Sequence, residues 1–193
     1  MFTGIIETLA KAENIKKENA NVHIVFSSSI THELKIDQSI SHNGVCLTVV
    51  AIAEDTYTVT AIQETLSRTN IGELQKGNLV NIERCMPANG RFDGHIVQGH
   101  VDTTAVCVEI RDLNGSFEFI FEYDKDQQNV TVEKGSITVN GVSLTVVHSD
   151  KNKFSVHIIP YTFEHTNFKS IKPGSKVNIE FDIIGKYIAR LLK

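Results

Sequence analysis

The sequence carries nearly the same eight residues twice, NGVCLTVV at residues 43–50 and NGVSLTVV at residues 140–147. The twelve-residue segments that end with these octapeptides agree at nine positions without a gap. The offset between them is 97 residues, about half of a chain of 193 residues. An ungapped repeat at this spacing predicts two copies of one folding unit. The first copy has Cys46 where the second has Ser143, and this difference predicts that the two copies have different functions.

The repeat extends over most of the chain. Residues 62–83 and 159–180 share the pattern I..T...TN......G..VNIE at the same offset, and residues 3–10 align with residues 98–105 at an offset of 95. The slip of two residues belongs in a loop, where insertions are tolerated. We therefore expect two tandem domains and a C-terminal segment, at residues 1–88, 89–183 and 184–193.

Both copies are rich in segments with the composition of β-strands. β-Branched and aromatic residues partly alternate with polar ones at residues 21–26, 56–61, 79–83, 116–122 and 154–159. Gly and Asn mark turns between such segments. We predict an all-β chain in which each half closes into a six-stranded, Greek-key-like barrel, because closure removes exposed sheet edges. One short helical turn is predicted in each copy, near residues 63–70 and 161–167.

The last residues follow a different period. Ile184, Ile188, Leu191 and Leu192 recur at the spacing of one face of a helix. A single stretch of about ten residues is only marginally helical alone. We therefore predict a C-terminal helix that packs against the barrels or against a neighbouring chain.

Composition disfavours several classes of function. A formal net charge of −4 argues against a nucleic-acid partner, because phosphate binding needs a clustered positive surface. The sequence has no apolar run of about 18 residues and no signal-peptide pattern, so we expect a cytoplasmic protein without a membrane segment. The three cysteines lack CxxC spacing and are expected to be free thiols, and the eight histidines lack a metal-binding spacing.

The repeated strand places its small polar residues on one face. In a strand, alternate side chains share a face. Cys46 and Thr48 are therefore expected on one face of this strand, and the apolar residues Val45, Leu47 and Val49 on the other. A lone cysteine is more often structural, but the serine at the equivalent position favours a functional thiol. His95 and His100 have no counterpart in the first copy; they are either surface residues or catalytic additions, and this asymmetry favours catalysis.

The order of these motifs resembles the riboflavin synthase family. The matching segments are MFTGIIE, SHNGVCLTV, DGHIVQGHVD, NGVSLTV and VNIEFD, which span nearly the whole chain. The resemblance implies a dismutation in which one 6,7-dimethyl-8-ribityllumazine donates a four-carbon unit to a second. The products are riboflavin and 5-amino-6-(D-ribitylamino)uracil, and no metal or organic cofactor is implied.

Two alternatives to this enzyme activity remain. The first is a non-catalytic lumazine or flavin carrier with the same fold, which would form a stable complex without product. The second is a flavin-binding oxidoreductase module, although no GxGxxG follows a predicted strand.

The resemblance also implies site residues and an assembly. Residues implied in catalysis are Cys46, His100, Ser39 and His95. Those implied in a first pocket are Gly4, Ile5, Ile6, Cys46, Leu47, Thr48, Thr60, Ala61, Ile62, Gln63, Glu64 and Thr65. Those implied in a second pocket are Gly99, His100, Val101, Lys134, Ser143, Leu144, Thr145, Ile159, Pro160, Tyr161, Thr162, Phe163 and Glu164. The implied assembly is a homotrimer that combines the first barrel of one chain with the second barrel of a neighbour, with lumazine synthase as a further partner.

Overall fold

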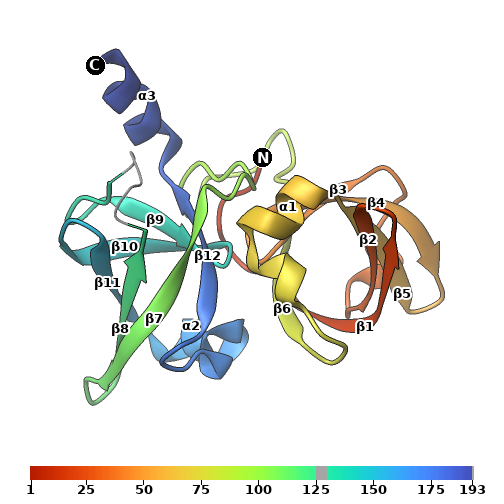
Figure 1. Cartoon of the computed structure of the whole chain (residues 1–193), viewed down its shortest axis with the longest axis horizontal. Coiled ribbons are helices and arrows are strands. Elements are labelled where there is room, and N and C mark those ends of the chain that lie inside the picture. Colours follow the sequence, from red (N-terminus) through yellow and green to blue (C-terminus); the bar gives the residue numbers. More distant parts are fainter. Residues whose placement is uncertain (125–129, 193) are drawn as a thin grey trace.

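The computed structural model describes residues 1–124 and 130–192, which form two antiparallel β-barrels lying side by side (Figure 1). The strands of the first barrel are β1 (Thr8–Glu18), β2 (Asn21–Ser27), β3 (Ser39–His42), β4 (Val45–Ala53), β5 (Thr56–Ala61) and β6 (Leu79–Arg84). Those of the second are β7 (Thr103–Asp112), β8 (Phe117–Tyr123), β9 (Ser136–Val139), β10 (Val142–Ser149), β11 (Lys153–Ile158) and β12 (Lys176–Phe181). The short helices are η1 (Thr31–Glu33), α1 (Gln63–Arg68), η2 (Asn70–Glu73), α2 (Pro160–His165), η3 (Asn167–Ser170) and α3 (Ile183–Leu191).

The two barrels have the same strand order. The first closes as β1-β2-β5-β4-β3-β6, and the second closes as β7-β8-β11-β10-β9-β12. The first octapeptide contains the β3–β4 turn and the start of β4, and the second contains the β9–β10 turn and the start of β10. These are equivalent places in the two barrels. The predicted pair of six-stranded barrels is therefore confirmed, and so are the helical turns at α1 and α2.

Side chains fill the barrel interiors, because a barrel of this size leaves no internal channel. Val45, Leu47 and Val49 of β4 are no more than 5% exposed, whereas Cys46 is half-buried and Thr48 is exposed on the outer face. The alternation predicted for this strand is confirmed. A ligand cannot enter the packed interior, so any binding site lies on the outside of the barrels.

One polar pair interrupts the apolar core of the first barrel. His42 is fully buried, and its Nε2 lies 2.8 Å from the hydroxyl of Tyr57 while its Nδ1 lies 3.1 Å from the carbonyl of Ile40. Burial lowers the pKa of His42 to about 4, so the imidazole is neutral near pH 7. The equivalent residues of the second copy, 97 positions later, are Val139 and Phe154.

The asparagines of the repeat join the two barrels. The Asn43–Gly44 turn between β3 and β4 has φ angles of 47° and 80°, the left-handed conformation that a tight two-residue hairpin requires. The Asn178 side chain donates to the carbonyl of Asn43 at 2.8 Å, and the Asn81 side chain donates to the carbonyl of Asn140 at 2.9 Å. These four residues are buried, and their hydrogen bonds connect the two barrels.

Helix α3 confirms the predicted C-terminal helix. The Asp182 side chain accepts a hydrogen bond from the amide of Ile184 at 2.9 Å, which satisfies one of the free N–H groups at the start of the helix. The helix projects away from the second barrel (Figure 1) and leaves Ile184, Ile188 and Leu191 more than half exposed. No helix among the described residues is long and apolar enough to span a bilayer.

Candidate active site

Each barrel is contacted on its outside by a segment from the other copy, and we call residues 3–6 and 98–101 the crossing segments. The carbonyl of Gly99 accepts a hydrogen bond from the amide of Cys46 at 2.9 Å, and the carbonyl of Gly4 accepts one from Ser143 at 2.8 Å. A Cβ added to Gly99 would lie 2.7 Å from Cys46 Cβ, and one added to Gly4 would lie 2.6 Å from Ser143 Cβ. Only glycine permits this close approach.

This exchange corrects the predicted composition of the two pockets. The resemblance groups Gly4, Ile5 and Ile6 with Cys46 in a first pocket, whereas in the structure Gly4 contacts Ser143 and Ile6 packs against the core of the second barrel. Val101, assigned to the second pocket together with Gly99 and His100, packs against the core of the first barrel. The reason is that each crossing segment lies against the barrel of the other copy, and only after it does the chain enter the first strand of its own barrel.

A cavity of about 240 Å³ lies where the second crossing segment meets β4 and α1. Its walls come from β4, from α1 with its flanking residues, and from the crossing segment: Val45, Cys46, Ile62, Glu64, Thr65, Arg68, Thr69, Gly99, His100 and Val101. Cys46 and His100, 54 residues apart in sequence, are thus brought into one pocket.

Cys46 is a protonated thiol near neutral pH. Burial raises its pKa above the ordinary cysteine value, and a hydrogen bond with Ser39 opposes this effect. Ser39 lies on β3, the strand paired with β4. The predicted residues Ser39 and Cys46 are therefore neighbours, and the thiol can donate a proton but is not a preformed thiolate.

Ser143 of the second barrel has a different partner. His95 Nδ1 lies 2.7 Å from Ser143 Oγ, and its Nε2 lies 3.1 Å from Thr138 Oγ1. Burial lowers the pKa of His95, so this imidazole is neutral and bridges two hydroxyls. The structure thus separates the two predicted histidines, with His95 at the second barrel and His100 at the first.

Several predicted residues of the first barrel do not line the cavity. Leu47 and Ala61 point into the barrel core, and Thr48 is exposed. Thr60 Oγ1 lies 2.9 Å from His23 Nδ1, and Gln63 is exposed on α1.

The remaining predicted residues of the second barrel lie on β10, at the turn before β9 and around α2. Leu144 packs against the core, Thr145 is exposed on β10, and Phe163 of α2 stacks on Phe117 with ring centroids 4.3 Å apart. Lys134 is exposed at the turn before β9. The partly or largely exposed residues at the start of α2 are Ile159, Pro160, Tyr161, Thr162 and Glu164.

Sequence reasoning missed residues that support the pocket. Val45, Arg68 and Thr69 line the cavity without having been singled out, although Thr69 belongs to the repeated TN pair. Phe2 is fully buried, and its ring would lie 2.8 Å from a Cβ at Gly99. Within residues 1–124 and 130–192, no three His, Cys, Asp or Glu side chains are grouped in a way that could hold a metal ion.

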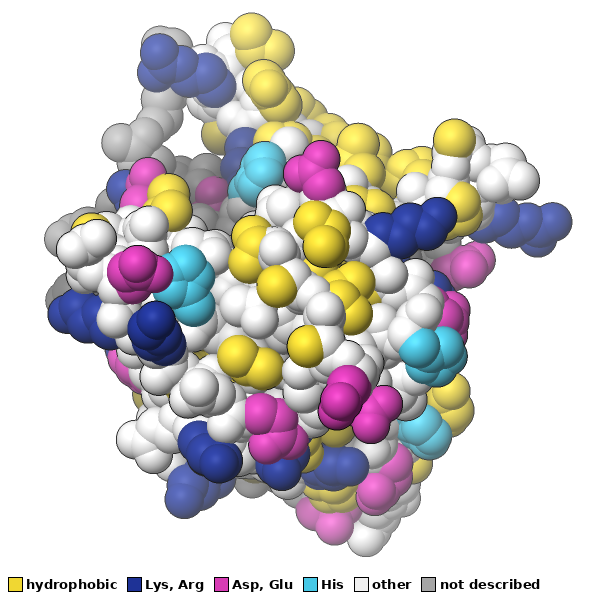
Figure 2. Space-filling model, turned by 90° about the vertical axis from the view of Figure 1, so that its right-hand side faces the viewer, with side chains coloured by type: hydrophobic (Ala, Val, Ile, Leu, Met, Phe, Trp, Pro, Cys, Tyr) yellow, Lys and Arg dark blue, Asp and Glu magenta, His cyan; other side chains and the backbone are white. Residues whose placement is uncertain are grey.

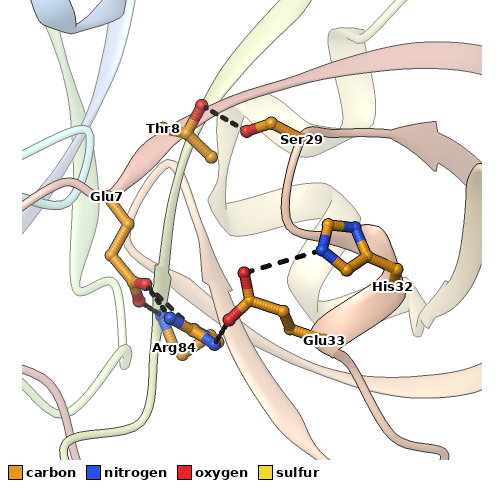
Figure 3. A network of polar contacts seen from close by, with 6 residues as sticks. All are labelled: Glu7, Thr8, Ser29, His32, Glu33 and Arg84. Carbon is orange, nitrogen blue, oxygen red and sulfur yellow. Dashed lines mark hydrogen bonds and ion pairs between the residues drawn. The ribbon is translucent and has the colours of Figure 1, made fainter.

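A second cavity, of about 560 Å³, lies between the first crossing segment and the linker after β6, and is lined in part by Ile5 and Arg84. Arg84 donates to Glu7 at 2.6 and 2.9 Å and to Glu33 at 2.7 Å (Figure 3). Its charge is balanced by two carboxylates, so it is not available to an anionic ligand here. Figure 2 shows that acidic and basic side chains are mixed over the face of the first barrel, without a continuous basic patch.

The comparisons with known proteins agree with this geometry. The family described as "Lumazine binding domain" matches twice, at residues 3–85 and 98–182. Riboflavin synthase of Actinobacillus pleuropneumoniae is 43% identical over the whole of this chain and 90% of its own length. Riboflavin synthase of Bacillus subtilis is 42% identical with the same coverage.

Solved structures share the fold. LumP complexed with riboflavin matches with a TM-score of 0.86 at 24% identity, over 94% of this chain and 99% of that one. LumP complexed with 6,7-dimethyl-8-(1'-D-ribityl) lumazine matches with a TM-score of 0.84 at 22% identity and the same coverage.

Proposed function

The chain belongs to the riboflavin synthase family, and from this premise we propose that it converts two molecules of 6,7-dimethyl-8-ribityllumazine into riboflavin and 5-amino-6-(D-ribitylamino)uracil. A four-carbon unit passes from one lumazine to the other, so the products together contain all atoms of the two substrates. This reaction is the last step of riboflavin formation. A reaction between two copies of one substrate fits a protein made of two similar but unequal barrels.

The observation that carries the proposal is the meeting of Cys46 and His100 in one cavity, supplied by different copies of the repeat. A thiol and an imidazole are groups that can move protons to and from a bound ring. Because burial raises the pKa of Cys46, we assign the thiol to proton transfer rather than to addition to a ring carbon. The hydrogen bond with Ser39 lowers the pKa of Cys46 and so favours release of this proton.

The second barrel provides a different environment for the second lumazine. The hydroxyl of Ser143 is held by the neutral imidazole of His95, which offers a hydrogen bond but no thiol. We propose that residues of α1 and α2, from Ile62 to Thr65 and from Ile159 to Glu164, contact the ribityl chains and ring edges. Holding two rings in fixed orientations is the main contribution of the protein, since it replaces an improbable encounter.

We further propose that the working form is a homotrimer in the cytoplasm. The first barrel of one chain would face the second barrel of its neighbour, so that the donor and acceptor pockets meet. Supporting this, α3 leaves an apolar groove of about 450 Å³ beside Val130 and Val132, lined by Ile184 and Ile188. The three unpaired thiols fit a reducing compartment. Lumazine synthase, which would supply the substrate, is a candidate partner.

The non-catalytic carrier is the less supported alternative, because full-length relatives at 42–43% identity carry the enzyme's name, whereas the LumP structures share 22–24% identity. The test is to incubate the purified protein with the lumazine and no added cofactor. Riboflavin and the aminouracil should appear in equal amounts. A stable fluorescent complex without either product would identify a carrier instead.

A further inference from the structure

The repeated VNIE motif ends in two buried glutamates, Glu83 in β6 and Glu180 in β12, which are 4% and 2% exposed. The carboxylate of Glu180 accepts hydrogen bonds from three consecutive backbone amides: Gln98 at 2.7 Å, Gly99 at 3.0 Å and His100 at 2.9 Å. These amides belong to the second crossing segment, which forms a wall of the Cys46 cavity. Glu180 therefore binds the main chain of the pocket rather than a side chain.

Glu83 makes the equivalent contacts in the other direction. Its carboxylate accepts from the amide and hydroxyl of Thr3 at 2.7 and 2.8 Å, and from the amide of Gly4 at 2.9 Å. Gly4 in turn contacts Ser143. Each glutamate thus lies in one barrel and holds the segment that its own copy extends to the other barrel.

The far ends of both crossing segments have their own anchors. Asp102 accepts from the amide of Phe181 at 2.9 Å and pairs with Lys186 of α3, while Glu7 accepts from the amide of Arg84 at 2.7 Å and pairs with its guanidinium. The end of the second segment that touches Cys46 is held by Glu180. Loss of that carboxylate would release the amides of Gly99 and His100 and leave the segment attached through Asp102 and through the single hydrogen bond between the Gly99 carbonyl and Cys46.

We propose that Glu180 is a positioning residue that fixes His100 and Gly99 against Cys46 in the first pocket, and that Glu83 does the same for Gly4 against Ser143. The inference deepens the proposed function and rests on it for the consequence in turnover. Glu180 is not a catalytic acid or base, because it is buried and both of its oxygens are occupied by backbone donors. It acts through the residue that it holds.

The test compares Glu180→Gln with Glu83→Gln, each in a Cys85→Ser background. Both changes remove the charge of an equivalent, equally buried glutamate, so each controls for general loss of stability in the other. In Glu180→Gln one carboxylate oxygen becomes an NH2 group, which cannot accept a hydrogen bond from the backbone N–H groups that face it. The probe is iodoacetamide without substrate. Cys107 is fully buried, so Cys46 is the thiol that reacts.

We expect Glu180→Gln to raise the alkylation rate of Cys46 about threefold or more, because the Gly99 main chain no longer covers it, and Glu83→Gln to leave this rate unchanged. Under turnover, we expect Glu180→Gln to lower kcat about tenfold or more. Equal alkylation in all three proteins, or equal acceleration by both variants, would overturn the inference.

Alkylation is measured without lumazine, so it tests the positioning role of Glu180 independently of the enzyme activity. If the parent protein makes no riboflavin, the proposed function is refuted, but the alkylation result still decides the positioning role. If Glu180→Gln does not fold, Glu180→Asp keeps the charge but withdraws it by one methylene. Faster alkylation of Cys46 is then again expected, and an unchanged rate would again overturn the inference.

Discussion

His95 Nδ1 lies 2.7 Å from the hydroxyl of Ser143 in the second barrel, whereas the equivalent Cys46 of the first barrel has Ser39 as its side-chain neighbour. His95 precedes the aligned part of the second copy, so the repeat provides no matching imidazole in the first. Two strands of almost identical sequence therefore present different proton chemistry to their pockets. The first offers a thiol, and the second offers a hydroxyl held by a neutral imidazole.

We expect Cys46→Ser to bind lumazine normally but to slow turnover about tenfold or more, which corresponds to at least about 1.4 kcal/mol in the barrier. The fold should tolerate the change, because Ser143 already occupies the equivalent position. Single-turnover rates at saturating lumazine separate the chemical step from binding. A wild-type rate would make the thiol structural and move the catalytic role to His100 and Ser39.

The reciprocal change, Ser143→Cys, is not expected to produce a faster enzyme. A thiol is a weaker hydrogen-bonding group than a hydroxyl, so the contact with His95 would weaken. The second pocket would still lack His100, which lines the cavity of the first barrel. The measurement is kcat/KM beside the parent protein. An increase would show that the two pockets are interchangeable.

The seam between the barrels predicts a loss of stability on Asn178→Ala. The Asn178 side chain accepts from the amide of Asn70 at 2.7 Å and donates to Asn43 O and Asn70 Oδ1 at 2.8 and 2.9 Å. Removing it leaves buried partners unsatisfied, so we expect the free energy of unfolding to fall by about 2–4 kcal/mol. Denaturant unfolding measures this. Asn81→Ala makes the equivalent change from the other barrel and should cost about the same; a clearly smaller cost would contradict the symmetric role.

Much of the fold could be predicted from local pattern and repetition. The alternation around Cys46 and the turn residue Gly44 indicate a hairpin, and the apolar spacing of Ile184 and Ile188 indicates α3. These features depend on neighbours in sequence, which is why the structure confirms them.

The exchange of the crossing segments could not be predicted in the same way. Aligning Gly4 with Gly99 shows that they are equivalent, but it does not show which barrel each one contacts. That choice depends on packing across the seam, where the carbonyl of Gly99 meets Cys46. The repeated VNIE motif marked Glu83 and Glu180 as equivalent, but their partners, 80 or so residues away in sequence, become visible only in three dimensions.

Removal of residues 183–193 tests the proposed assembly. Ile184, Ile188, Leu191 and Leu192 are 52–83% exposed, and such a surface favours burial against a neighbouring chain. We expect the truncated protein to sediment as a smaller species than the full chain at the same concentration. Leu191→Lys is a milder variant with the same expected direction. If both remain trimeric, α3 is not part of the interface, and a monomeric full-length protein would refute the inter-chain site.

The buried pair of His42 and Tyr57 predicts a pH dependence of stability. The pKa of His42 is about 4 in the folded protein and near 6.5 when the chain is unfolded, so between these values the unfolded state binds more protons. The free energy of unfolding should therefore fall as pH decreases from about 6.5 to about 4, by up to ~3 kcal/mol from this residue.

The second barrel supplies the control, because its residues at these places are Val139 and Phe154. The double variant His42→Val with Tyr57→Phe should lose the part of the acid sensitivity that belongs to His42 and keep the part due to carboxylates. His42→Val alone leaves the Tyr57 hydroxyl, in a side chain that is 1% exposed, without its partner, at a cost of about 1–3 kcal/mol at all pH values. Denaturant unfolding of wild type and double variant from pH 7 to pH 4 makes the measurement. As pH falls from 7 to 4, wild type should lose up to ~3 kcal/mol of stability relative to the double variant; a difference between the two proteins that stays constant would show that His42 does not resist protonation in the folded barrel.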